Sequence, residues 1–227
     1  MKSILQIVAT IVLLQIIISC ENNTPQVKTQ PTKKLVVLAY DISMSNDDYA
    51  LLKEKHLEEL FSKVAFNGGG KFYSILIKAQ SKEQEIFEYT IPAFDTLALV
   101  GNPYQVKRRM KRNVEILTPF HTKQADFVQK TKEAVIKPKT ERFTDLKNAM
   151  KLAEGTLNQN MYANRDKYLI IISDGINDLP PVNGEDKLKT TNFENVKVIL
   201  VRPTRTNYVT GKTLITTNSI QDALMNL

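Results

Sequence analysis

The chain has 227 residues and a formal net charge of +7. Its single cysteine, Cys20, excludes a disulfide within the chain, so stability must come from the hydrophobic core or from a bound metal. The positive charge favours anionic partners such as lipid head groups, but the sequence lacks the interleaved aromatic and basic residues typical of nucleic-acid binding, so no nucleic-acid partner is expected.

The first 19 residues have the pattern of an export signal, in which Lys2 is followed by an apolar run that ends at Cys20. The run is short for a membrane span. Its end, Ile-Ile-Ser-Cys, resembles a bacterial lipobox. The resemblance implies that residues 1–19 are a lipoprotein signal peptide and that Cys20 is lipidated. The mature protein would then be anchored to a membrane of the bacterial cell envelope, on its periplasmic or surface side. An uncleaved anchor with an incidental cysteine is the alternative.

The segment that follows is polar and contains two prolines, "ENNTPQVKTQPTK" from Glu21 to Lys33. It has almost nothing to bury, so residues 20–33 are expected to form a flexible tether. The folded part then covers residues 34–227, which is enough for one well-packed domain.

The hydrophobic pattern alternates between strands and helices. Continuous or alternating apolar runs predict strands at residues 34–41, 71–79, 85–91, 167–173, 196–201 and 213–217. Apolar residues at the helical period predict helices at residues 47–64, 106–117, 127–135, 144–157 and 219–227. The 71–79 and 85–91 strands are expected to pair as a hairpin. The order predicts an α/β fold, Rossmann-like and doubly wound, with a mostly parallel central sheet and helices on both faces.

Oxygen-bearing side chains follow two of the buried strands. Asp41, Ser43 and Ser45 come after the first strand, and Asp174 comes after the 167–173 strand, while Thr144 opens a helix. Ligands of open α/β sheets bind beyond the carboxyl ends of the strands, and right-handed crossovers would bring Thr144 to the same edge. Carboxylates and hydroxyls without histidine or cysteine are the donors that Mg²⁺ or Mn²⁺ prefers. The pattern therefore predicts a site for a hard divalent cation.

Three segments in this order resemble a von Willebrand factor A domain. "DISMS" at residues 41–45 matches the D-x-S-x-S element, "TDLKNAM" at 144–150 matches the threonine segment that opens a helix, and "IIISDG" at 170–175 matches the strand that ends in Asp-Gly. The resemblance covers most of residues 34–217. The chain departs from the family at Met44, where glycine is common, and at residues 176–195, which read as a loop in place of a helix.

The resemblance implies a metal-ion-dependent adhesion site. Ser43, Ser45 and Thr144 would touch the ion, and Asp41 and Asp174 would hold it directly or through water. An open coordination position would accept an acidic residue of a protein partner. The implied function is a metal-dependent protein-binding or adhesion module with no catalytic residues, so the chain is not expected to be an enzyme.

Simpler interpretations exist for each of these residues. Ser45, with Asp48 three residues later, has the spacing of a capping box and could simply start the first helix. Thr144 before Asp145 could cap its helix in the same way. Asp174 with Gly175 could form an ordinary turn after a strand.

Two other functions compete with the adhesion module. "SDGIND" at residues 173–178 resembles a motif of haloacid dehalogenase-like phosphatases, but Ser43 stands where those enzymes need a second aspartate as acid. A metal-independent scaffold lipoprotein is the other alternative. For that function the basic run at residues 106–112, "VKRRMKR", is the feature of interest. Such a run is usually the solvated side of a helix, and otherwise a site for an acidic partner or a lipid surface.

Overall fold

The computed structural model describes residues 32–43, 51–79, 85–136, 142–178 and 189–227. The predicted signal peptide, Cys20 and most of the predicted tether lie outside these ranges. The described elements are β1 (Lys34–Asp41), α2 (Glu54–Ala65), β2 (Gly70–Ile77), β3 (Phe87–Ile91), α3 (Pro103–Val135), α4 (Leu146–Leu157), the 3-10 turn η3 (Asn160–Tyr162), β4 (Asp166–Ile172), β5 (Thr191–Val201), β6 (Val209–Thr217) and α5 (Ile220–Met225).

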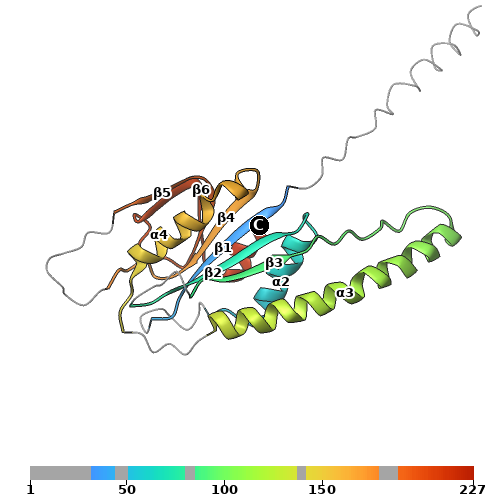
Figure 1. Cartoon of the computed structure of the whole chain (residues 1–227), viewed down its shortest axis with the longest axis horizontal. Helices are drawn as coiled ribbons and strands as arrows, with labels where there is room; N and C mark the ends of the chain where they lie inside the picture. The colour runs from blue at the N-terminus through green and yellow to red at the C-terminus, as the bar shows by residue number, and fades with distance from the viewer. Residues whose placement is uncertain (1–31, 44–50, 80–84, 137–141, 179–188) are drawn as a thin grey trace, which may run out of the picture. The chain divides into compact units, whose positions relative to one another are not determined.

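Six strands form a single sheet in the order β3-β2-β1-β4-β5-β6 (Figure 1). Every neighbouring pair is parallel except β2 and β3, which form the predicted antiparallel hairpin. The strand order reverses between β1 and β4, which is the point where ligands bind in open α/β sheets. The prediction of an α/β fold with a mostly parallel sheet is confirmed.

Residue alternation along β1 divides the apolar interior into two clusters. Val36, Leu38 and Tyr40 pack in one cluster with residues of α2, α3 and α5. Leu35, Val37 and Ala39 pack in the other with residues of α4. All eight residues of β1 are buried, as its continuous apolar run predicts.

The helix predicted from residue 47 begins later in the structure. α2 starts at Glu54, and its N-cap is Lys53. The N-cap of α2 is therefore not Ser45, and Ser45 itself lies outside the described residues. At the other end of the chain, β5 starts at Thr191 and takes in part of the segment predicted to be a loop.

The two helices predicted on either side of Pro119 are a single helix of 33 residues, α3. A proline inside a helix removes one N–H and therefore one hydrogen bond, here the bond to the Glu115 carbonyl. Both residues are exposed, so water can bind that carbonyl. Tertiary packing continues the helix past the proline, because Phe120 and Phe127 lie 5.5 and 5.4 Å from the Phe61 ring in α2.

No helix in the part of the chain that the structure describes is long and apolar enough to span a membrane. Although α3 has the length, its hydropathy does not meet this requirement.

The start of α2 depends on a buried histidine. The Lys53 backbone N–H donates a hydrogen bond to His56 Nδ1 at 3.1 Å, which closes the first turn. Burial lowers the pKa of the His56 imidazole below its ordinary value of 6.5, and the charges of Lys55 and Lys53 lower it further. The folded protein therefore keeps His56 neutral, with Nδ1 as acceptor.

This histidine predicts a pH dependence of stability. The unfolded chain binds a proton at His56 near pH 6.5, whereas the folded chain resists it, so the free energy of unfolding should fall as the pH drops below 6.5. His56→Gln keeps an acceptor at the same helix position and does not titrate. Urea denaturation between pH 7.5 and 5 should show that the free energy of unfolding of this variant changes less with pH than that of wild type. His121→Gln, at an exposed position, is the matched control. Equal profiles for H56Q and wild type would contradict the assignment.

Candidate functional site

The carboxylate of Asp41 ends β1 inside the protein. It is fully buried, and each of its oxygens accepts a hydrogen bond. Oδ1 accepts from the backbone N–H of Ser43 at 2.8 Å, and Oδ2 accepts from the Ser173 hydroxyl at 2.6 Å. Ser173 directly follows β4, so the carboxylate joins the ends of two neighbouring parallel strands. These contacts fix the orientation of the Asp41 side chain.

Asp174 begins the loop after β4. Its Oδ1 accepts a hydrogen bond from the Ile176 backbone N–H at 2.9 Å, which is the turn expected of an aspartate before glycine. Its carbonyl accepts the backbone N–H groups of Thr204 and Arg205, which belong to the connection between β5 and β6. The turn is therefore real, and it holds the half-buried carboxylate at the carboxyl edge of the sheet.

Thr144 lies across the same edge. It forms a two-way backbone bridge with Asp178 in the loop after β4, with N···O distances of 2.7 and 3.0 Å. The next residue, Asp145, donates its backbone N–H to the Lys78 carbonyl just after β2. Because β1 lies between β2 and β4, a segment that touches both flanking loops passes over the end of β1, where Asp41 lies. The buried Thr144 is thus on the same rim as Asp41 and Asp174.

The start of α4 does not use Thr144 as its cap. Asp145 is the N-cap, and its side chain accepts the Asn148 backbone N–H at 3.0 Å. Asn177 Oδ1 also accepts from the backbone N–H groups of Leu146 and Lys147. The capping interpretation of Thr144 is therefore wrong, and this buried threonine does not act as the helix cap.

The electrostatics of this edge disfavour two negative charges. Burial raises the pKa of the Asp41 carboxyl, hydrogen bonds from Ser173 and Ser43 lower it, and the negative charge of Asp174 raises it again. Burial also raises the pKa of the Tyr208 hydroxyl, and the charges of Asp174 and Asp41 raise it further. Tyr208 Oη is buried and has no hydrogen-bond partner among the described residues. A cation at this edge would offset the repulsion that these groups share.

The donor set fits a hard divalent cation. Two carboxylates and the hydroxyls of Ser43 and Thr144 are oxygen donors, which Mg²⁺ and Mn²⁺ accept, and Mg²⁺ is usually held by one or two carboxylates together with waters. Among the described residues no three His, Cys, Asp or Glu side chains gather as a metal-binding group. The predicted metal ligands include only two carboxylates, Asp41 and Asp174, and the other ligands are hydroxyls, so they do not form a group of that kind. Ser45, the remaining predicted ligand, lies outside the described residues.

The sequence pattern missed three residues of this edge, namely Ser173, Asn177 and Tyr208. Ser173 and Asn177 stand beside Asp174 in the chain, and the register of β1 with β4 is the signal that would have placed Ser173 opposite Asp41. Tyr208 had no such signal. It reaches the site only because the connection between β5 and β6 packs against Gly175.

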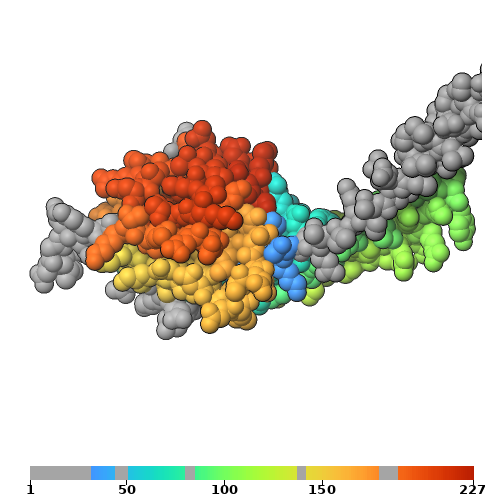
Figure 2. All heavy atoms as spheres, turned by 90° about the horizontal axis from the view of Figure 1, so that it is seen from above, coloured from blue at the N-terminus to red at the C-terminus, as the bar shows by residue number. Residues whose placement is uncertain are grey.

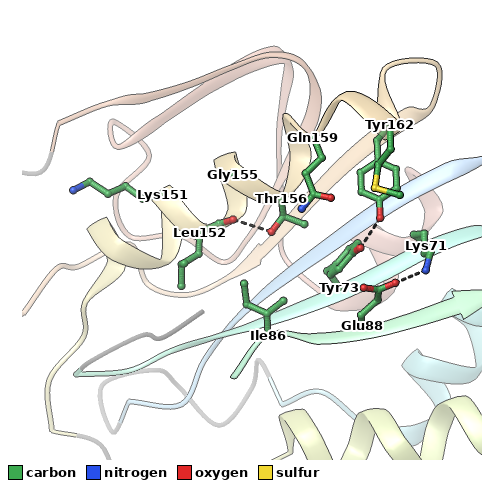
Figure 3. Close-up of a pocket in the computed structure, with 11 residues that line it drawn as sticks. Lys71, Tyr73, Ile86, Glu88, Lys151, Leu152, Gly155, Thr156, Gln159 and Tyr162 are labelled. Carbon is green, nitrogen blue, oxygen red and sulfur yellow. Dashed lines mark hydrogen bonds and ion pairs between the residues drawn. The ribbon is translucent and has the colours of Figure 1, made fainter. Parts of the chain in front are cut away.

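A hollow that the sequence did not indicate lies away from this edge. It has a volume of about 560 Å³ and is lined by residues of β2, β3, α4 and η3 (Figure 3). The hydroxyls of Tyr73 and Tyr162 lie 2.5 Å apart at its wall, and an ion pair joins Lys71 to Glu88. None of the predicted site residues lines it, so the two features are separate.

Comparisons with known proteins leave the family open. No protein-family model and no curated protein matches the chain. Among solved structures, proximal thread matrix protein 1 of the mussel byssus, in its second crystal form, is similar with a TM-score of 0.40 and 15% sequence identity. The alignment covers 86% of this chain and 46% of the mussel protein, so this chain spans less than half of that protein. A likeness of this size carries no conclusion about function.

The turn at Gly175 gives a test of how rigidly the site is built. Gly175 has a φ of +81°, and a Cβ there would lie 2.4 Å from the Arg205 carbonyl oxygen and 2.7 Å from Tyr208 Cε1. Gly175→Ala should therefore lower the free energy of unfolding by about 1–3 kcal/mol. The matched control is Gly155→Ala, in a helix with nothing within 4 Å of the added Cβ, which should stabilise by about 0.5–1 kcal/mol. Urea denaturation measures both. Equal effects of the two substitutions would show that the packing around Gly175 does not constrain the turn.

Proposed function

We propose that this chain is a metal-dependent protein-binding module of the von Willebrand factor A type, exported and held at a bacterial membrane by lipidated Cys20. The proposal is supported by the position of Asp41, Ser43 and Asp174 at the carboxyl edge of the sheet, where the strand order reverses, and by the bridge from Thr144 to the loop after β4 at the same edge. We also propose that the fold is the doubly wound arrangement of this family, with helices on both faces of the sheet.

Each residue has a proposed role at the ion. The hydroxyls of Ser43 and Thr144, with that of Ser45, contact a Mg²⁺ or Mn²⁺ ion, and the carboxylates of Asp41 and Asp174 balance its charge directly or through water. When bound, the ion supplies a Lewis-acidic position that accepts a carboxylate from a partner protein. Hydrogen bonds to Ser43, Ser173 and Ile176 orient both carboxylates before the ion arrives.

The burial of Asp41 supports binding rather than a solvated surface role. A buried carboxylate beside a second carboxylate is unfavourable, and the burial and repulsion that raise the pKa of Asp41 are the cost that a dication removes. Two carboxylates neutralise the charge of the ion without exceeding it. The ion therefore keeps its attraction for one more anionic oxygen.

The first test is the thermal stability of residues 31–227, the compact unit that contains all the described elements. A Mg²⁺ concentration about a hundredfold above the Kd should raise the Tm by about 5–10 °C. Asp174→Ala should abolish this shift. The matched control is Asp166→Ala, an exposed position at the opposite end of the same strand, which should keep it.

The decisive quantity in this test is the Mg²⁺-dependent shift, not the stability without metal. Removing Asp174 also removes its repulsion of Asp41, so the metal-free variant is not expected to be less stable than wild type for that reason. An equal Mg²⁺ shift in wild type and in Asp174→Ala would overturn the assignment. Phosphatase turnover that depends on Asp41 would instead support the enzyme alternative.

The second test concerns the partner. Immobilised residues 31–227 should retain a protein from a solubilised bacterial envelope extract in Mg²⁺, and chelator should release it. Ser43→Ala and Thr144→Val remove hydroxyl donors at the ion and should reduce retention, whereas Thr213→Val, at an exposed position on β6, should not. Retention that persists in chelator would favour the metal-independent scaffold.

A further inference from the structure

The basic run of α3 belongs to an arm that extends away from the sheet. We define the basic arm as residues 92–116, which comprise the strip between β3 and α3 and the first half of α3. In two views at right angles the arm, drawn in green, projects beyond the other described residues (Figures 1 and 2). The first fully buried side chain of α3 is Phe120. Within the arm Phe94, close to the end of β3, packs against the core, and the basic half of the arm contributes no buried side chain.

The strip and the helix hold each other in this position. The Leu97 backbone N–H donates to Asn113 Oδ1 at 2.8 Å, and Asn113 Nδ2 donates back to the Leu97 carbonyl at 2.9 Å. Arg109 Nη1 donates to the Ala98 carbonyl at 2.7 Å. The start of the helix is closed by a capping box between Asn102 and Gln105. The arm is therefore a built hairpin and not a frayed helix end.

The arm carries a strong excess of positive charge, because its two acidic residues, Asp95 and Glu115, lie near its ends. Between Leu97 and Val114 the sequence has five basic residues and no acidic residue. The basic residues are Lys107, Arg108, Arg109, Lys111 and Arg112. The solvated face of an ordinary surface helix usually mixes charges of both signs, which shield each other. This surface instead presents a concentrated positive potential.

The same arm exposes large apolar side chains. Leu99, Val100, Tyr104, Met110 and Val114 are between 50% and 78% exposed. Met110 and Val114 are one helical turn apart and share a face with Lys107 and Lys111, according to the helical period. Apolar side chains interleaved with cations are typical of segments that lie in the interface of a membrane, with the cations at the head groups. A purely electrostatic contact would not need the apolar residues.

The position of the arm in the fold agrees with a membrane-facing role. Lys34 pairs in register with Gly70, and Gly70 pairs with Ile91, so all three mark the amino-terminal edge of the sheet. The arm leaves the sheet directly after Ile91, from the edge at which the chain enters β1. Asp41 lies at the opposite end of β1. Contact of the arm with a membrane would therefore leave the candidate metal site directed away from it.

We propose that the basic arm binds the head-group region of an anionic phospholipid membrane. Its lysines and arginines contact the lipid phosphates, and Leu99, Tyr104 and Met110 enter the apolar boundary of the bilayer. This contact would add a second attachment to the lipid proposed at Cys20. The proposal does not depend on a metal ion or on a protein partner.

The test uses residues 31–227, which lack the predicted lipid anchor and contain both core clusters. Sedimentation should show binding to vesicles of equal parts phosphatidylglycerol and phosphatidylcholine, and little binding to phosphatidylcholine alone. Each basic residue near an anionic surface multiplies the partition coefficient about fivefold, so removing four should lower it by roughly several hundredfold. The charge variant replaces Lys107, Arg108, Lys111 and Arg112 with glutamine.

A matched control removes four exposed lysines from elsewhere, by replacing Lys55, Lys151, Lys189 and Lys212 with glutamine. This variant has the same net charge as the charge variant, but its partition coefficient should fall by less than about fivefold. The variant Leu99→Ser with Tyr104→Ser and Met110→Ser should also bind less, by about tenfold or more. Circular dichroism checks that all variants are folded.

Asp41→Asn should bind vesicles as wild type does, which separates this result from that of the metal test.

Three outcomes would overturn the proposal. Equal vesicle binding by wild type and by the charge variant would show that the arm is not the contact. Equal binding to both kinds of vesicle would remove the role of charge. Absence of vesicle binding, with a dimer of wild type that the charge variant does not form, would assign the arm to contact between copies of this chain.

Discussion

A buried carboxylate at the junction of two parallel strands organises this protein. Asp41 ends β1 out of contact with solvent, and such a group is tolerated only when hydrogen bonds or a cation satisfy it. The Ser43 backbone N–H and the Ser173 hydroxyl bind its two oxygens and so connect the end of β1 to the end of β4. Burial raises the pKa of the Asp41 carboxyl, and the negative charge of Asp174 raises it further. The bridge from Thr144 to Asp178 connects the start of α4 to the loop after β4 at this same edge.

The two edges of the sheet differ in chemistry, and the difference suggests a division of roles. The carboxyl edge gathers carboxylates and hydroxyls, which suit a small hard cation. The basic arm leaves the amino-terminal edge with five cations and several exposed apolar side chains. If both proposals hold, the arm and the lipid at Cys20 attach the protein to a membrane, and the metal edge is available to a partner. Parallel strands make this separation natural, because they direct all their carboxyl ends to one side.

The sequence predicted those parts of the fold that depend on local pattern. β1 was predicted with its observed bounds because both of its faces are buried, which leaves a continuous apolar run. The hairpin and α4 also follow from period and turn residues. The helix before Pro119 was predicted to end there, because proline opposes helix locally. The observed helix continues because Phe120 and Phe127 pack on Phe61, a residue more than fifty positions earlier in the chain.

The sequence by itself determined which oxygen donors stand at strand ends, since strand ends are local events marked by the change from apolar to polar residues. It also contained the basic run and its charge. Only the tertiary structure decided that Thr144 bridges to Asp178, that Ser173 binds Asp41 and that Tyr208 lies close to Gly175, because these contacts depend on strand order and register. It also decided that the basic run is part of an arm beyond the core. Apolar residues recur at the same helical spacing in a helix that packs on a sheet and in one that extends away from it. Only long-range packing distinguishes the two.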